Sequence, residues 1–362
     1  MSKKSFSAWL AYLSALLFTT LTANAQELQP QRVSTSTGIY DVQSRDDIHK
    51  FSASEIRELV RMENGRPQNI GTHPHPILVY CFEERTFLYT GGKYQNAEIA
   101  YRLRTPRNIR FRKKYPLVVH LHGLGDDSLT HAHSILPMLI GPEQRDFFML
   151  VVQAPRTGPE QGWFFRPSTK DGSLDIVMAA LEHVVANNPI DSRSITVTGI
   201  SSGGWGTWEI ITRHPDVFAG AVPAASGAPS SGRLTTLKQT PVWAFINKGD
   251  GHRFRESIHT ATHMLKGAGG SMASTEVVPI STHPWQPAME DYNALQWMLA
   301  QKRGSWFSPL PGVVINNGPH SLLLVFIMYV MPFALIVIFS WNTICQWVPV
   351  GYQHVREWCS KL

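Results

Sequence analysis

The stretch ITVTGISSGGWGTW, residues 195–208, decides how this chain folds. Its first four residues favour a β-strand, and they lead directly into a turn with three glycines among the six residues 199–204. Glycine loses more backbone freedom on folding than any other residue, so ordering this turn is costly. The composition of the turn therefore indicates an unusual backbone conformation, and a helix is predicted to follow it at 203–214.

On both sides of this stretch, apolar strand-like runs alternate with segments of helical spacing. Strands are predicted at residues 97–106, 116–123, 147–155, 194–199, 219–226, 241–250 and 274–280. Helices are predicted at residues 173–185, 203–214, 254–266 and 290–302. Alternation of apolar strands with helices is typical of a parallel sheet that helices cover on both faces. The predicted fold class is therefore α/β, with a mostly parallel sheet.

Three local patterns add detail to this prediction. Residues 97–106 alternate between polar and apolar side chains, which is typical of an edge strand. Ser173 is expected to cap the helix that follows it. Ser52 and Glu55 have the spacing of a capping box at the start of a short helix, within an N-terminal extension of unknown role at 26–92.

The glycine-rich turn lies where ligand sites of parallel α/β sheets are found, beyond the carboxyl end of a strand. Its G-x-S-x-G spacing between a strand and a helix is the context of a nucleophile elbow. Gly199 and Gly203 are the second neighbours of Ser201, where side chains would crowd a tight turn. Gly204 would let the helix pack close to the sheet. Only Ser201 has glycine at both second neighbours, whereas Ser202 has it on one side alone. Ser201 is therefore the predicted nucleophile, and an ordinary glycine-serine loop is the alternative.

Candidates for the other two members of a catalytic triad follow later strands. A serine hydroxyl needs an adjacent base, which a carboxylate in turn orients, and in this fold the chain order is serine, acid, histidine. Asp250 ends the run at 241–250 and is the candidate acid. His283 follows the last predicted strand and is the candidate base. The other histidines nearby are interpreted as surface residues: His252, His259 and His263.

An oxyanion hole needs backbone N–H donors, which are positioned before the reaction begins. The N–H of Ser202, directly after the nucleophile, is one candidate. The other is the N–H of Leu124, in the glycine-containing loop after the strand at 116–123. His122 lies in this loop too, and we interpret it as a structural side chain that holds the loop rather than as a base.

Four segments together resemble the α/β-hydrolase superfamily. They are LHGLGD (121–126), GISSGGWGTW (199–208), HPDVFAGAVPAASG (214–227) and the histidine loop that contains Trp285. Within the superfamily, residues 93–303 are similar to the secreted esterases grouped with polyhydroxybutyrate depolymerases and feruloyl or acetylxylan esterases, and to the related predicted-peptidase group. The resemblance implies a triad and an oxyanion hole at the residues named above. It also implies that Trp163 and Trp285 line the acyl site.

These residues predict a serine esterase that transfers an acyl group to water. The substrate is expected to be a small or polymer-linked carboxylic ester, and neither a metal nor an organic cofactor is expected. Two alternatives stay open at this point, a serine peptidase of the prolyl-oligopeptidase type and a non-catalytic binding protein on a hydrolase fold. The acyl and alcohol groups and the oligomeric state are not predicted.

The first residues have the pattern of an export signal. Lys3 and Lys4 precede a short apolar core at 10–21, and Ala23-Asn24-Ala25 fits a cleavage site, so residues 1–25 are predicted to be removed. An uncleaved membrane anchor is the alternative. A signal of this kind would place the main body outside the cytosol, on the periplasmic or extracellular side.

Residues 322–341, LLLVFIMYVMPFALIVIFSW, carry no charge and are about as long as a helix that crosses a bilayer. Pro332 would kink this helix, which membrane helices tolerate, and Trp341 and Trp347 suit the interfacial zone. The prediction is a transmembrane helix, followed by a short tail at 342–362, and a buried core helix is the alternative. The catalytic domain is predicted at 93–310.

The composition excludes several classes of protein. With 43% hydrophobic and 17% charged residues in 362, the chain is not of the disordered class. The formal net charge is +6, and no basic run stands out, so nucleic acid is not an expected partner. Cys81 is alone in the exported part, so no disulfide framework is expected there.

Overall fold

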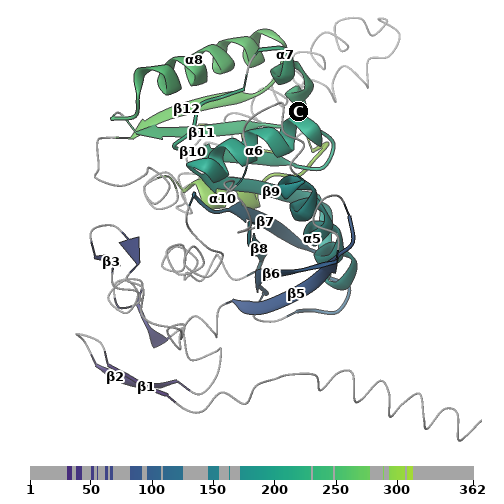
Figure 1. Ribbon diagram of the computed structural model, residues 1–362, viewed down its shortest axis with the longest axis vertical. Coiled ribbons are helices and arrows are strands. Elements are labelled where there is room, and N and C mark those ends of the chain that lie inside the picture. The colour runs from purple at the N-terminus through teal and green to yellow at the C-terminus, as the bar shows by residue number, and fades with distance from the viewer. Residues whose placement is uncertain are drawn as a thin grey trace, which may run out of the picture. The chain divides into compact units, whose positions relative to one another are not determined.

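The structure is a computed structural model. It describes residues 31–34, 38–42, 50–52, 55, 62–63, 66–67, 82–91, 96–106, 109–124, 146–154, 163, 172–229, 231–247, 249–277, 288, 293–305 and 308–312. Its eight-stranded sheet has the order β12-β11-β10-β9-β7-β8-β6-β5 (Figure 1). The chain forms two compact units, residues 1–190 and 191–362.

Among the described elements, the first unit contains four of these strands and one helix. Its elements are β5 (Glu83–Tyr89), β6 (Ala97–Arg104), β7 (Tyr115–Leu121), β8 (Phe148–Val152) and α5 (Ser173–Asn187). β7 and β8 are parallel, and every residue of β8 is buried, in agreement with the continuous apolar run in its sequence. α5 contacts β5 and β8 and buries one stripe of its surface, which includes Leu174, Val177 and Leu181.

The structure corrects two local predictions in this unit. β6 is not an edge strand, because β5 pairs with it on one side and β8 on the other, both antiparallel. β5 lies in the stretch assigned to the N-terminal extension, and its own alternating pattern marks the exposed edge. Ser173 is the first residue of α5 rather than its cap, since Gly172 takes the cap position with a left-handed φ of 79°.

The second unit carries four parallel strands that follow one another in the sheet as they do in the chain: β9 (Ile190–Ile200), β10 (Gly220–Ala224), β11 (Val242–Asn247) and β12 (Met272–Val277). The helical elements described between and after them are α6 (Ser202–Arg213), α7 (Ser231–Leu234), η4 (Thr235–Leu237), α8 (His252–Gly267) and α10 (Ala294–Leu299). α6 contacts β10, and α8 contacts β11 and β12. Trp297 of α10 packs edge to face on Trp243 of β11, with ring centroids 5.8 Å apart. The predicted α/β class is confirmed.

The N-terminal region contains two short hairpins and the predicted capping box. β1 (Gln31–Ser34) pairs with β2 (Ile39–Val42), and β3 (Met62–Glu63) pairs with β4 (Arg66–Pro67). The Ser52 N–H donates to Glu55 Oε2 at 2.7 Å, and the Glu55 N–H donates to Ser52 Oγ at 3.2 Å. These reciprocal bonds are those of a capping box, so this prediction is confirmed.

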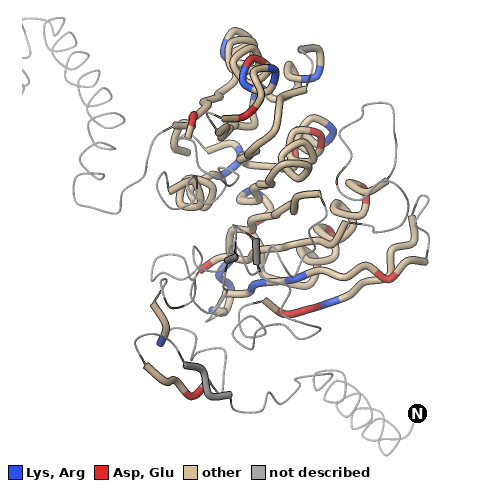
Figure 2. Tube along the Cα trace, turned by 60° about the vertical axis from the view of Figure 1, so that its left-hand side comes forward, with Lys and Arg blue, Asp and Glu red and all other residues tan. Residues whose placement is uncertain are grey.

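No helix in the described ranges has both the length and the apolar character that a bilayer crossing requires. The predicted span at 322–341 and the predicted signal at 1–25 lie outside those ranges and stay predictions. Figure 2 shows where the basic and acidic residues lie along the described chain.

A buried ion cluster joins α6 to α7 in the second unit. Glu209 is 5% exposed and accepts hydrogen bonds from Arg213 Nε at 2.7 Å and from Arg233 Nη2 at 2.9 Å. Burial raises the pKa of the Glu209 carboxyl, but the two guanidinium groups outweigh burial, and the pKa is lower than its ordinary value.

This shift makes the stability of the chain depend on pH. A carboxyl whose pKa is lower in the folded chain stabilises it above the unfolded pKa, and this contribution is lost as the pH falls through the folded pKa. We expect Glu209→Gln to lower the free energy of unfolding by about 1–3 kcal/mol at pH 7. The difference from the parent protein should shrink in acid. Urea unfolding followed by tryptophan fluorescence at pH 7 and in acid measures both quantities.

Glu182→Gln is the matched control, because Glu182 is an exposed residue of α5. Its free energy of unfolding should stay within a few tenths of a kcal/mol of the parent value. A Glu209→Gln deficit that is the same at both pH values would show that the charge of Glu209 is not what stabilises the cluster.

Candidate active site

Ser201 lies on a strained turn between β9 and α6. Its φ is 55° and its ψ is −116°, and a positive φ is rare for a residue with a side chain. Its N–H donates to Ala224 O at 3.0 Å, which fixes the turn to the end of β10, and its carbonyl accepts from the Trp205 N–H at 3.1 Å. The predicted strand-turn-helix context of Ser201 is therefore present.

Two glycines make this turn possible by allowing backbones to approach closely. A Cβ at Gly199 would lie 2.3 Å from Gly203 O and 2.8 Å from Thr207 Oγ1, so β9 has no room for a side chain there. A Cβ at Gly204 would lie 2.5 Å from Ala224 O. Gly204 therefore lets α6 pack close to β10, as the sequence predicted.

The start of α6 offers backbone donors. The first N–H groups of a helix have no partner within the helix and favour negative charge. The first turn of α6 carries no acidic side chain that would satisfy them. Ser202 supplies one of these N–H groups, and its own hydroxyl is buried, whereas Ser201 is partly exposed. Of these two serines, Ser201 therefore has the side chain that solvent can reach.

Asp250 lies beyond the carboxyl end of β11. The Asp250 N–H donates to Asn247 O at 2.8 Å, and Asp250 Oδ2 accepts from the Asn247 N–H at 2.8 Å. The Gly249 N–H donates to Asn247 Oδ1 at 3.0 Å, so the turn is held at three points. One carboxylate oxygen of Asp250 is thus tied to the end of its own strand.

The parallel register brings the ends of these strands to one edge. Ile200 is opposite Ala224, and Ala224 is opposite Phe245. Ser201 and Asp250 therefore leave the sheet at the same edge, with β10 between their strands. His283 and Trp285 lie outside the described residues, so their places at this edge stay predictions.

Ala225, at the end of β10, also has a strained backbone, which the sequence did not predict. Its φ is 53°, and its N–H donates to Phe245 O at 3.0 Å. A Cβ at Gly227, two residues later, would lie 2.6 Å from the ring of Trp205. The sequence signal for this close packing is the run of small residues at 219–228, AGAVPAASGA.

In the first unit, His122 holds the loop that follows β7. The Ala154 N–H donates to His122 Nε2 at 3.0 Å, so Nε2 is an acceptor and the neutral ring carries its proton on Nδ1. Nδ1 lies 2.8 Å from Gly123 O and donates to it. Both ring nitrogens are occupied and the side chain is buried, so the interpretation of His122 as structural is confirmed.

Two predicted site residues lie close to this loop in the first unit. The Leu124 side chain is exposed, and its proposed role rests on its backbone N–H alone. The Trp163 ring is buried, with its centroid 5.2 Å from that of His122. Trp163 therefore packs against the side chain that holds the loop. Its contact with substrate stays a prediction.

Comparisons with known proteins agree with this geometry. Residues 143–261 match the prolyl oligopeptidase family. A poly(3-hydroxyalkanoate) depolymerase C of Paucimonas lemoignei is 30% identical over 118 residues, which are 31% of this chain and 28% of the depolymerase. The chain thus spans less than a third of that relative.

Solved structures are similar over a larger share of the chain. A thermostable esterase is 26% identical with a TM-score of 0.53, and the match covers 63% of this chain and 64% of the esterase. A ferulic acid esterase is 17% identical with a TM-score of 0.45, covering 60% of this chain and 97% of its own. The resemblance predicted from the sequence is confirmed: the chain has the fold of the α/β-hydrolase superfamily, and residues 143–261 are similar to the prolyl oligopeptidase family.

Proposed function

We propose that this protein is a serine hydrolase that cleaves carboxylic esters with Ser201 as its nucleophile. The observation that carries the proposal is the backbone of Ser201, which takes a φ of 55° between a strand and a helix. Such strain costs free energy and persists where the surrounding structure holds it, as at nucleophile elbows. The contacts of Gly199 and Gly204 hold it here.

The proposed reaction is acyl transfer to water through an acyl-enzyme. His283 takes the proton of Ser201 as the hydroxyl attacks the ester carbonyl, and Asp250 orients His283 and stabilises its charged form. The N–H groups of Leu124 and Ser202 hold the developing oxyanion. His283 then returns its proton to the leaving alcohol, and a water molecule releases the acid. This chemistry requires neither a metal nor an organic cofactor.

Different comparisons favour ester and amide substrates. The similarity to a depolymerase and to a thermostable esterase supports ester hydrolysis. The match of residues 143–261 to the prolyl oligopeptidase family supports a serine peptidase as the second candidate. The sequence at 219–241 contains no inserted lid segment. This disfavours a lipase that acts on bulk fat.

A substrate panel separates these candidates. The full-length protein is assayed with short p-nitrophenyl esters, feruloyl esters and peptide amides, in parallel with labelling by a fluorophosphonate. We expect labelling and ester turnover, with amide turnover much lower. Faster turnover of amides than of esters would assign the peptidase function, and absence of both labelling and turnover would assign a non-catalytic protein.

Asp250 provides a test of the proposed acid. Asp250→Asn should lower kcat by about 10³–10⁴-fold, because an uncharged partner does not stabilise the imidazolium. Asp216→Asn is the control, since Asp216 is exposed in the connection between α6 and β10, away from the edge that carries Ser201. Equal activity of Asp250→Asn and the parent enzyme would remove Asp250 from the proposed site.

The proposal also includes an organisation for the whole chain. It consists of a signal peptide (1–25), an N-terminal extension (26–92), a catalytic domain (93–310), a transmembrane helix (322–341) and a short tail (342–362). The catalytic domain would be tethered to a membrane on the side away from the cytosol. Trp163 and Trp285 would line the acyl pocket, as the resemblance implies.

A further inference from the structure

A tight turn ahead of β7 presents an aromatic side chain to solvent. The Lys113 N–H donates to Arg110 O at 3.2 Å, which closes the turn, and the Arg110 N–H donates to Tyr115 Oη at 2.8 Å. Arg112 takes a φ of 61° within it. Phe111 at the tip is 88% exposed, and Ile109 is 53% exposed. The turn is therefore held by one backbone bond and by the Tyr115 hydroxyl, while its two apolar side chains face solvent.

The same turn is strongly basic. Five of the eight residues from 107 to 114 are Arg or Lys, so the prediction that the chain has no basic run was wrong. Arg110, Arg112 and Lys114 are exposed, while Lys113 pairs with Asp146. The Arg112 guanidinium lies 5.1 Å from the centroid of the Phe111 ring, within cation–π distance. An exposed aromatic ring thus lies beside a guanidinium group, in a turn with three exposed cations.

We infer that this turn, residues 109–114, docks on an anionic lipid surface. Phe111 would enter the boundary between headgroups and acyl chains, and Arg110, Arg112 and Lys114 would lie beside the phosphates. Aromatic rings favour this interfacial zone, and basic side chains are attracted to anionic leaflets. The 88% exposure of Phe111 is the observation that favours lipid over a purely ionic partner.

A lipid surface is also the partner that the rest of the chain suggests. The charge-free run at 322–341 would tether the chain to a bilayer if it spans a membrane. Nucleic acid is disfavoured, because its affinity rises with the number of phosphates that Lys and Arg neutralise, and this turn offers only three exposed cations.

In the first unit, docking through this turn would leave the proposed oxyanion loop open to solvent. The turn precedes β7, and the loop with Leu124 follows β7. The seven residues of β7 separate the two ends by about 23 Å. A bilayer at the turn would therefore lie at the far end of this strand from the loop.

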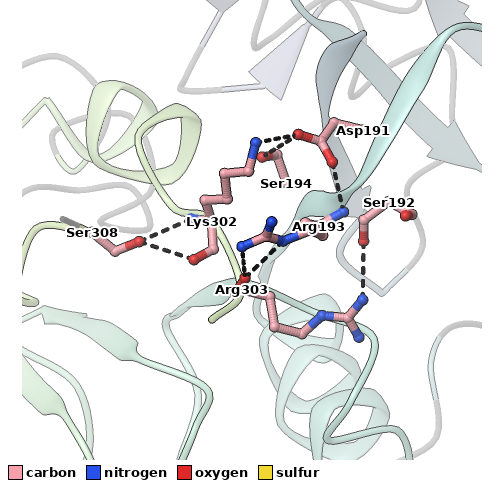
Figure 3. Close-up of polar contacts among 7 residues, drawn as sticks. All are labelled: Asp191, Ser192, Arg193, Ser194, Lys302, Arg303 and Ser308. Atoms are coloured by element: carbon pink, nitrogen blue, oxygen red, sulfur yellow. Dashed lines mark hydrogen bonds and ion pairs between the residues drawn. The ribbon is translucent and has the colours of Figure 1, made fainter. Parts of the chain in front are cut away.

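Within the second unit, the chain that follows α10 lies near the amino ends of the strands, away from the end that carries Ser201. The Arg303 N–H donates to Arg193 O at 2.7 Å, and Arg193 donates back to Arg303 O, so the chain after α10 is fixed near the amino end of β9 (Figure 3). Lys302 adds an ion pair to Asp191 at 2.8 Å. A Cβ at Gly312 would lie 3.1 Å from that of Ala273, near the amino end of β12. The last described residues, 308–312, therefore include one, Gly312, that lies near the strand ends opposite Ser201.

Hydrogen–deuterium exchange of the full-length protein tests the docking. The protein is placed in nanodiscs of phosphatidylcholine alone or of phosphatidylcholine with phosphatidylglycerol, and the peptide that covers 109–114 is followed. We expect slower exchange in the anionic discs only, and loss of this slowing at high salt. Phe111→Ser and the double variant Arg110→Glu/Lys114→Glu should each lose it too, while ester hydrolysis of a soluble substrate is unchanged.

Leu88→Ser is the matched control, because Leu88 is 62% exposed on β5, in an edge strand of the same unit. This variant should keep the slower exchange of the turn. Exchange that is equal in the two kinds of disc would overturn the inference. So would slowing by a soluble polyanion such as duplex DNA without any slowing in anionic discs, which would assign the turn to a nucleic-acid partner.

Discussion

Ser201→Ala is expected to abolish covalent labelling by a fluorophosphonate and to lower the kcat for ester hydrolysis by a factor on the order of 10⁶. The hydroxyl of Ser201 is the only group at this turn that the proposed mechanism uses to form the acyl-enzyme. Alanine fits the same backbone site about as well as serine, so the fold should persist. Intact-mass spectrometry after labelling, together with steady-state kinetics on a p-nitrophenyl ester, measures both effects.

The control for this variant is Ser192→Ala. Ser192 is an exposed serine of the same strand, β9, near its amino end. It should label and turn over substrate as the parent protein does. Labelling that persists in Ser201→Ala at the parent rate would mean that another residue is the nucleophile, and the proposed function would then lose its central residue.

The strands and the elbow could be predicted because their signals are local. The continuous apolar runs of β7, β8, β10 and β11 match buried strands, and the glycines around Ser201 match backbone contacts within a few residues. Strand pairing is different, because it joins distant segments. The position of β6 inside the sheet depends on its pairing with β5, and the alternating sequence of β6 carries no record of that partner.

In the candidate site, too, the features with a local sequence signal could be predicted, and those that depend on how the chain folds could not. Ser201 and its turn follow from spacing alone, and so does the position of Asp250 after a buried strand. The bond from the Asn247 N–H to Asp250 Oδ2 could not be predicted, since it depends on how the turn closes. The positive φ of Ala225 was missed because alanine gives no warning of a left-handed backbone. The basic turn at 109–114 was missed because net charge averages over the whole chain.

Gly199→Ala is expected to cost the chain about 3 kcal/mol of unfolding free energy, at the upper end of the range for overpacked sites. The new Cβ would lie 2.3 Å from Gly203 O and 2.5 Å from Gly203 C. These are backbone atoms of α6, so a side-chain rotation cannot relieve the contact, and α6 must move away from β9. Because Ser201 lies between these two residues, fluorophosphonate labelling should be lost together with stability. Urea unfolding and labelling of the same sample measure the two effects.

Gly267→Ala separates this steric effect from the general effect of replacing a glycine. Gly267 is the last residue of α8, and a Cβ there would meet nothing within 4 Å. Alanine favours a helix over glycine by up to about 1 kcal/mol, so this variant should be as stable as the parent or slightly more stable. It should also label normally. If Gly199→Ala unfolded at the same urea concentration as Gly267→Ala and kept its labelling, the close approach of α6 to β9 would not be what holds Ser201 in its strained conformation.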